Sequence, residues 1–269
     1  RSGVYTIGRF VWEKFDLLES AAAQEAFDCI YSLTRCEQER YVHMGIESPY
    51  IPWGCYTESF SPIASPSGDE TVRFFYPGGH LTQRKPTLEA LEAFRRVTNP
   101  RARLIVKAQH AQRAAEIAAR IDFVDSRIQW IIDDMSTNDH FALFNSCDVC
   151  FAPSRWEGLG LHLYEAVEHG MPTITTDAAP MNEMVTHGID GLLVPASSYS
   201  ERRPGVPIWE PDGEAMTAAI EALCDDGLRT KLAEGAHQRR ATRPWSATVD
   251  GFQALLENVT MVTRNTQEL

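Results

Sequence analysis

Short apolar runs alternate with segments of helical spacing over most of the chain. Five runs have the length and the β-branched or aromatic content of strands: residues 72–76, 103–107, 128–132, 149–152 and 173–176. Between them, apolar side chains recur at helical spacing over residues 87–97, 111–121, 139–146 and 161–169. Several of the strands are apolar on both faces, which requires helices on both sides of a parallel sheet. The pattern predicts an α/β fold with a doubly wound parallel sheet over about residues 60–245.

The first 60 residues have the pattern of a separate, incomplete α/β unit. We expect a strand over residues 4–11, mostly helix over 21–44 and another strand over 49–53. Such a piece cannot bury both faces of its own sheet, so we expect a preceding segment or another chain to cover it. Because the chain begins with Arg1, the sequence is expected to start part-way through a longer product.

The remaining segments are assigned by composition and spacing. Residues 61–69 are rich in Pro and Ser and are expected to be a linker, and residues 196–213 contain three prolines and are expected to be a long loop. Helical spacing resumes over residues 214–224, 228–240 and 248–262.

The charge balance narrows the possible partners. Lys and Arg number 25 and Asp and Glu 37, which gives a net charge of −12 and disfavours duplex nucleic acid and anionic membranes as partners. A small phosphate ligand remains possible, because backbone dipoles can bind one on an acidic protein. No apolar run is long enough to span a membrane, and six cysteines are too few for a disulfide scaffold. Cys147 and Cys150 are expected to pack at the start of a buried strand, and we expect a cytoplasmic location.

The densest candidate chemistry lies in residues 154–180. The first element is a strand-to-helix turn followed by the start of a helix: Glu157, Gly158, Leu159, Gly160 and Leu161. Unpaired N–H groups at the start of this helix, together with its dipole, favour a phosphate or diphosphate. Glu165 follows eight residues after Glu157, so both carboxylates can flank one ligand and accept hydrogen bonds from sugar hydroxyls.

A second anion-binding element follows the strand at residues 72–76. It consists of a glycine turn and nearby cationic side chains: Gly78, Gly79, His80, Arg84 and Lys85. Because the carboxyl ends of neighbouring parallel strands meet at one edge, we expect this element to bind the same diphosphate.

These motifs resemble those of the retaining glycosyltransferases of the GT-B fold, family 4 (group 1) type. The resemblance rests on the segment EGLGLHLYEAVEHGMPTITTDAAPMNEMVTHGIDGLLVP, on GGHLTQRKP, on Cys147 to Val149 and on Trp245–Ser246, with weaker similarity over residues 1–60. It implies a remnant of an acceptor-side Rossmann-like domain at 1–60, a Rossmann-like domain that binds a nucleotide sugar at 61–245, and a helix at 246–269 that crosses back to the first domain.

The resemblance also implies roles for individual residues. Glu165 would bind the ribose, Glu157 would face the donor sugar, and the amides from Gly158 to Leu161 would meet sugar and phosphate. Lys85 would stabilise the diphosphate as negative charge develops on it. The base would lie near Ile132 and Asp133. The family's arginine is replaced by His80, which leaves the site one cation short unless His80 is protonated or Arg84 substitutes for it.

The implied activity is transfer of a hexose from a UDP- or GDP-sugar to an unknown acceptor hydroxyl, with retained configuration and without a metal or other cofactor. Three alternatives remain: a glycoside hydrolase using Glu157 and Glu165 as its carboxylate pair, a non-catalytic module that binds nucleotide sugars, and a sugar-nucleotide epimerase. Elsewhere in the motif, Asp177 and Glu183 are expected to cap turns, and His162 to be a surface or packing residue.

Overall fold

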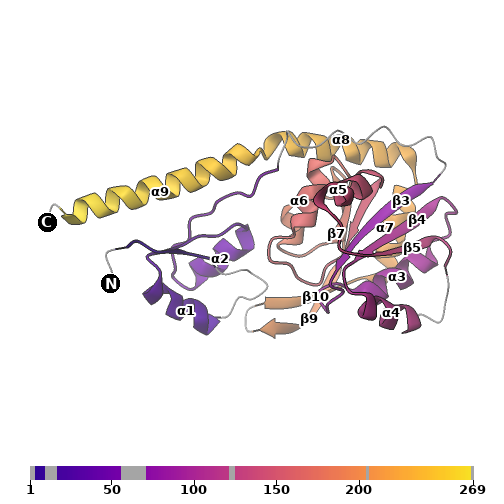
Figure 1. Ribbon diagram of the computed structural model, residues 1–269, viewed down its shortest axis with the longest axis horizontal. Coiled ribbons are helices and arrows are strands. Elements are labelled where there is room, and N and C mark those ends of the chain that lie inside the picture. Colours follow the sequence, from indigo (N-terminus) through magenta and orange to yellow (C-terminus); the bar gives the residue numbers. More distant parts are fainter. Residues whose placement is uncertain (1–3, 10–16, 56–70, 121–124, 204–205, 268–269) are drawn as a thin grey trace.

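The computed structural model describes residues 4–9, 17–55, 71–120, 125–203 and 206–267 (Figure 1). Its largest element is a six-stranded, fully parallel sheet in the order β5-β4-β3-β6-β7-β8. The strands are β3 (Val72–Gly79), β4 (Ala102–Ala108), β5 (Ile128–Ile132), β6 (Val149–Ala152), β7 (Thr173–Thr176) and β8 (Gly191–Val194). The predicted doubly wound parallel sheet is therefore confirmed, and β8 is an edge strand that the sequence pattern did not reveal.

Helices cover both faces of the sheet. They are α3 (Thr87–Arg96), α4 (Ala111–Arg120), α5 (Thr137–Asn145), α6 (Leu161–Glu168), α7 (Gly213–Leu223) and α8 (Asp226–Thr242). Alternate side chains of β3 enter different cores: Phe74 packs with residues of α3 and α7, whereas the adjacent Phe75 packs with residues of α5 and α6. Both Phe74 and Phe75 are almost fully buried, as expected for a central strand covered on both sides.

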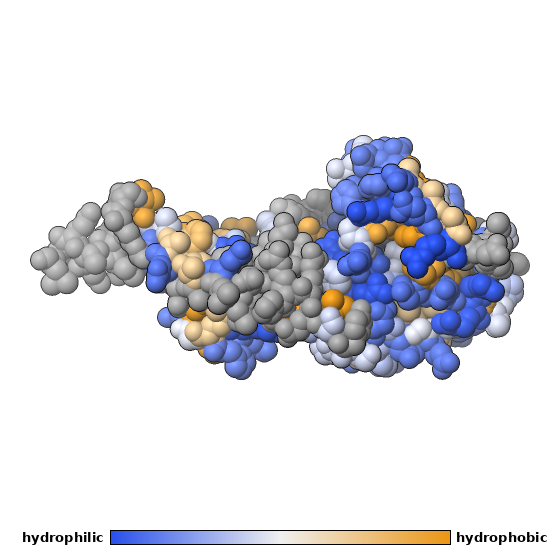
Figure 2. Space-filling view, turned by 90° about the horizontal axis from the view of Figure 1, so that it is seen from below, coloured by the Kyte–Doolittle hydropathy of each residue, from blue (hydrophilic) through white to orange (hydrophobic). Residues whose placement is uncertain are grey.

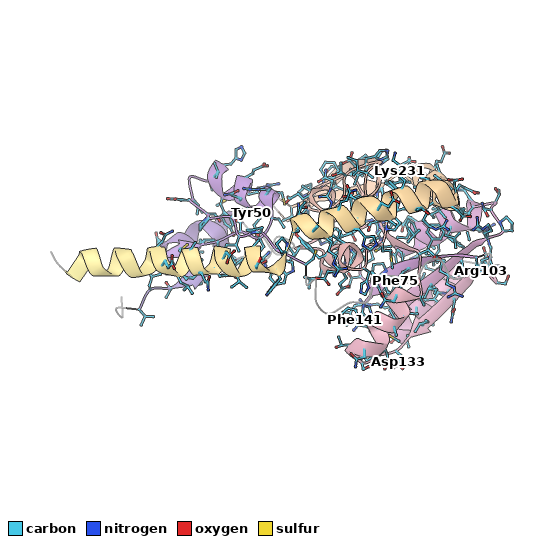
Figure 3. The ribbon with its side chains drawn as sticks, turned by 90° about the horizontal axis from the view of Figure 1, so that it is seen from above. Tyr50, Phe75, Arg103, Asp133, Phe141 and Lys231 are labelled. Atoms are coloured by element: carbon cyan, nitrogen blue, oxygen red, sulfur yellow. The ribbon has the colours of Figure 1, made fainter. Side chains whose placement is uncertain are left out.

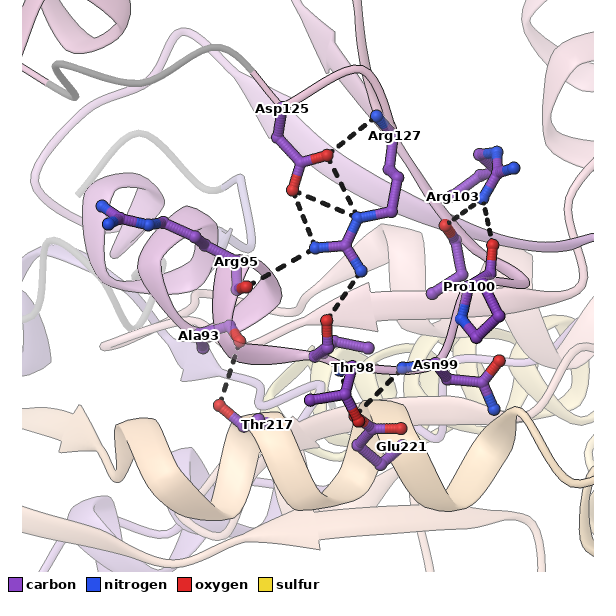
Figure 4. Close-up of polar contacts among 12 residues, drawn as sticks. Ala93, Arg95, Thr98, Asn99, Pro100, Arg103, Asp125, Arg127, Thr217 and Glu221 are labelled. Carbon is purple, nitrogen blue, oxygen red and sulfur yellow. Dashed lines mark hydrogen bonds and ion pairs between the residues drawn. The ribbon is translucent and has the colours of Figure 1, made fainter.

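Polar contacts fix the loops at the amino end of the sheet (Figure 4). The guanidinium of Arg127 donates to both carboxylate oxygens of Asp125 and to the carbonyl oxygen of Val97, at 2.7 Å for the latter. Glu221 on α7 accepts hydrogen bonds from the backbone N–H and the hydroxyl of Thr98. These bonds join α7 and β5 to the loop after α3, at the edge opposite the carboxyl ends of the strands.

The N-terminal part differs from the prediction. It contains β1 (Ile7–Gly8) and β2 (Cys29–Ile30) as a short parallel pair, with α1 (Leu17–Ala26) and α2 (Arg35–His43). The expected helix over residues 21–44 is wrong in its middle, because β2 interrupts it. The expected strand over 49–53 is reduced to a single bridge between Tyr50 and Ser32. Part of the strand expected at 4–11, and the linker expected at 61–69, lie outside the described residues.

The long loop expected over residues 196–213 is wrong. This segment is an antiparallel hairpin of β9 (Ala196–Arg203) and β10 (Val206–Pro211). Among the described residues, each of these two strands pairs only with the other, so prolines can occupy positions that need no ladder N–H. The hairpin contacts the loop after β6, where the N–H of Trp209 donates to the carbonyl oxygen of Arg155 at 3.1 Å.

The last helix, α9 (Trp245–Gln267), packs along the N-terminal part (Figure 1). Phe252 stacks edge-on against Tyr31, and the hydroxyl of Thr248 bridges the N–H of Gly54 and the carbonyl oxygen of Pro52. The chain at Cys55 is hydrogen-bonded on both sides of Pro244. A Cβ at Gly54 would collide with the backbone of Pro244, so this close approach requires glycine.

Hydrophilic side chains predominate on the face of the six-stranded part shown in Figure 2. Among the helices in the described ranges, none combines the length and apolar character needed to cross a membrane.

Candidate active site

The site lies where the order of the strands reverses. β3 and β6 are neighbours in the centre of the sheet, but their chain continuations lead to α3 on one face and α6 on the other. In open α/β sheets, ligands bind in the crevice at such a switch point. The two loops are joined directly, because the N–H of Arg155 donates to the carbonyl oxygen of Arg84 at 2.9 Å.

A buried ion pair connects these loops. Lys85 Nζ lies 2.6 Å from Glu157 Oε1, and the side chains are only 6% and 3% exposed. Ser154 completes the cluster: its hydroxyl accepts from Lys85 Nζ at 2.8 Å and donates to Glu157 at 2.7 Å. Arg84 lies 3.4 Å from the other carboxylate oxygen of Glu157. The sequence-predicted Arg84, Lys85 and Glu157 therefore share one polar cluster.

The surrounding charges fix the protonation of this cluster. Burial alone would raise the pKa of Glu157, but Lys85, His162 and Arg84 lower it to about 2. His162 Nε2 lies 3.8 Å from Glu157 Oε1 and has no hydrogen-bond partner among the described residues. Burial, followed by the charge of Lys85, lowers the pKa of His162 to about 4. At neutral pH the site thus holds an ionised Glu157 beside a neutral imidazole.

Two glycine turns flank the cluster. Gly160 caps the N-terminus of α6 with φ of +77°, and Gly79 at the end of β3 has φ of +53°. Both values fall in the left-handed region that favours glycine. A Cβ at Gly78 would lie 3.0 Å from the carbonyl oxygen of Lys107, so this turn also runs close to the neighbouring strand.

A cavity of about 480 Å³ opens beside the cluster, on the α5 and α6 side of the sheet. Its lining includes Gly78, Gly79, Arg84, Lys85 and Glu165 from the predicted set. His140 Nε2 on α5 lies 3.9 Å from the carboxylate of Glu165. Burial would raise the pKa of Glu165, but His140 and His162 lower it overall. Figure 3 shows Asp133 and Phe141, two further lining residues, close together at this edge of the molecule.

Other predicted site residues are placed less directly. Asp133 lines the cavity, but Ile132 is 38% exposed and is not among the lining residues. His80 is exposed and lies outside the lining, and its carbonyl oxygen accepts from Arg113 at 2.9 Å. Leu159 packs among apolar residues, whereas Leu161 is 52% exposed. Gly158 is buried in the turn before α6.

Several site residues were not predicted. Ser154, Lys107 and His140 were not singled out, and His162 was expected to be a surface or packing residue. Ser154 lies three residues before Glu157, a spacing that brings both side chains to Lys85. Lys107 is 6% exposed and directly follows three buried apolar residues of β4, Leu104 to Val106. A lysine next to such an apolar run is the sequence feature that could have identified Lys107 as a site residue.

The remaining expectations have simple outcomes. Cys147 and Cys150 are buried free thiols at β6, as expected. The carboxylate of Glu183 accepts from the backbone N–H groups of Arg35 and Cys36, at 2.7 and 2.8 Å. Glu183 therefore caps α2 in the N-terminal part, rather than the turn that follows it.

Comparison with known proteins identifies the family. The family model described as glycosyl transferases group 1 matches residues 72–226. The chain belongs to this family. Solved structures show the same fold, which is the Rossmann-like α/β fold of GT-B glycosyltransferases. Sucrose-phosphate synthase from Thermosynechococcus elongatus superposes with a TM-score of 0.76 at 19% identity, and the match covers 95% of this chain and 68% of the synthase chain. HepE of Anabaena, solved with UDP and glucose, has a TM-score of 0.71 at 16% identity and covers 95% and 71%.

Curated relatives of this group 1 glycosyltransferase chain match over shorter lengths. The lipopolysaccharide core biosynthesis mannosyltransferase LpsB of Rhizobium meliloti is 31% identical over 102 residues, 37% of this chain and 25% of that protein. The D-inositol 3-phosphate glycosyltransferase of Salinispora arenicola is 28% identical over 137 residues, 51% of this chain and 27% of that protein. The matched region therefore spans about a quarter of each relative.

Proposed function

We propose that this chain contains the donor-binding part of a retaining glycosyltransferase, which transfers a sugar from a nucleotide-diphosphate sugar to an acceptor hydroxyl without a metal. The observation that carries the proposal is the location of Lys85, Glu157 and Glu165. Lys85 and Glu165 line one cavity at the switch point, and Glu157, which is not among the lining residues, is paired with Lys85. Membership of the group 1 family supports transferase chemistry.

The proposed roles follow from charge. Glu165 is ionised and accepts hydrogen bonds from ribose hydroxyls, and the N–H groups at the start of α6 face the phosphates. Lys85 is paired with the carboxylate of Glu157. As the bond to the sugar breaks, negative charge develops on the leaving diphosphate, and Lys85 stabilises that charge. Glu157 then faces the electron-poor donor sugar, while a donor phosphate oxygen takes the proton of the acceptor hydroxyl.

Calorimetry with UDP, GDP and ADP tests the proposal. Saturable binding of at least one nucleotide, unchanged by EDTA, is expected. If none of the three nucleotides and none of their sugar conjugates binds, the proposed donor-binding function is rejected. The anomeric configuration of the transferred sugar, read by proton NMR, tests retention.

The variant Glu165→Ala isolates the proposed ribose contact. Loss of hydrogen bonds to a charged group costs about 1.5–3 kcal/mol, so nucleotide affinity should fall about tenfold to 100-fold. Affinity for inorganic pyrophosphate should not fall, because the lost group is an anion. Glu92→Ala, at an exposed position on α3, is the matched control. An equal loss for nucleotide and pyrophosphate would contradict the role of Glu165.

A further inference from the structure

Lys107 is a buried cation in the wall of the same cavity. It lies at the carboxyl end of β4, is 6% exposed and belongs to the lining. Its ammonium group donates to the carbonyl oxygen of Ala108 at 3.2 Å and to that of Asp133. An ammonium group carries three N–H donors, so one remains for a further acceptor.

The charge of Lys107 has no counterion within the described part of the chain. No carboxylate oxygen there lies within 4.0 Å of its nitrogen, whereas Lys85 has Glu157 at 2.6 Å. Carbonyl dipoles satisfy hydrogen bonds but carry no net charge. A buried charge without an opposite charge is unfavourable. An anion in the cavity would compensate it.

The other cations predicted for the diphosphate are less suited to this task. Lys85 and Arg84 both lie near the carboxylate of Glu157, and His80 is exposed outside the lining. Lys107, by contrast, is the register partner of Pro77 on β3, so it lies beside the turn formed by Gly78 and Gly79. This turn is one of the two proposed phosphate-binding elements.

We propose that Lys107 supplies the additional cation for the donor diphosphate, donating its remaining N–H to a phosphate oxygen. It thereby takes the charge role that the sequence assigned to position 80. This inference rests on the proposed function, because it requires a nucleotide diphosphate in the cavity. Two other roles for Lys107 predict different effects on binding. The lysine could be purely structural, holding the strand ends together through Ala108 and Asp133, or it could bind the base.

The test compares three probes: the nucleoside diphosphate that the unaltered protein binds, the corresponding nucleoside, and inorganic pyrophosphate. In Lys107→Met, affinity for the diphosphate and for pyrophosphate should fall about tenfold or more, while affinity for the nucleoside changes less than twofold. The dependence of diphosphate affinity on salt should also become weaker. Lys107→Arg keeps the charge and should retain more diphosphate affinity than Lys107→Met.

Lys231 provides the matched control, since it is exposed on α8, far from Asp133 (Figure 3). Lys231→Met should bind all probes as the unaltered protein does, and thermal unfolding checks that each variant is folded. Unchanged diphosphate binding in folded Lys107→Met would overturn this inference but leave the proposed function intact. An equal loss for nucleoside and diphosphate would also overturn it, by indicating a base contact. Absence of nucleotide binding by the unaltered protein would overturn both.

Discussion

Replacing Lys85 with Met tests the electrostatic core of the site. The change keeps most of the side-chain volume but removes the ammonium group that lies 2.6 Å from Glu157. The carboxylate of Glu157 then remains buried, with its side chain 3% exposed, but has lost its nearest cation. Breaking a buried pair by removing one partner usually costs about 3–5 kcal/mol, because the remaining charge is uncompensated.

The structure favours the lower end of that range. The pKa of Glu157 is lowered from 4.5 to about 2, and at 1.36 kcal/mol for each pKa unit this net shift corresponds to about 3 kcal/mol after the opposing effect of burial. Lys85 supplies the largest share of the lowering, but Arg84 and the hydroxyl of Ser154 remain in Lys85→Met. We expect the free energy of unfolding to fall by about 3 kcal/mol at pH 7.

The loss should depend on pH in a defined direction. A carboxyl group whose pKa is depressed in the folded state stabilises the protein fully above its unfolded pKa of 4.5, and this contribution is lost as the pH falls toward about 2. Without Lys85, less of the effect of burial is offset, so the pKa of Glu157 rises from its value in the unaltered protein. Acidification therefore neutralises the unpaired carboxylate, and the deficit of Lys85→Met should shrink as the pH falls from about 4.5 toward about 2.

Urea unfolding followed by circular dichroism, at a series of pH values, measures both effects. Lys231→Met is the control for removing a lysine, and the double variant Lys85→Met/Glu157→Gln should recover much of the loss because no buried charge remains. The reasoning is refuted if Lys85→Met is as stable as Lys231→Met. It is also refuted if the double variant is no more stable than the single one.

Two further variants test local structure. Gly160→Ala should lower stability by about 1–2 kcal/mol, because φ is +77° and the new Cβ would approach Leu163 to 3.2 Å. Gly188→Ala, at φ of +75° with no atom within 4 Å of the new Cβ, should cost less, as differential scanning calorimetry would show. Glu183→Ala removes the carboxylate that accepts from the first two N–H groups of α2, while the cap by Thr34 remains. The change should cost about 1 kcal/mol in urea unfolding, and no loss would contradict a stabilising role of Glu183.

The sequence revealed the central sheet because its strands are buried on both faces. Runs such as the one around Phe74 and Phe75 leave no ambiguity between strand and amphipathic helix once turn residues bound them. The N-terminal part was less predictable, because its short elements depend on distant contacts. α2, for example, is capped by Glu183, which lies 148 residues further along the chain from Arg35. No local pattern contains that information.

The same distinction applies to the site. Glycine turns and charged residues next to strand ends were visible in the sequence, and Lys85, Glu157 and Glu165 were selected on that basis. Ionisation states and pairings were not visible, because they depend on which loops meet across the sheet. The register of β3 and β4 then places Lys107 beside Pro77, whereas His80, just after β3, is exposed.

Two segments that are distant in the sequence, one at Cys55 and one at Pro244, lie side by side. The two segments are hydrogen-bonded to each other, with Cys55 N–H to the carbonyl oxygen of Arg243 at 2.8 Å and Trp245 N–H to that of Cys55 at 3.0 Å. Because they are hydrogen-bonded to each other, these two connecting segments move together and not independently. Rocking of the N-terminal part against the sheet would therefore bend both segments together, and it would also stretch the hydrogen bonds from Arg35 and Cys36 to Glu183. A Cβ at Gly54 would collide with Pro244, so the two segments can lie this close only with glycine there.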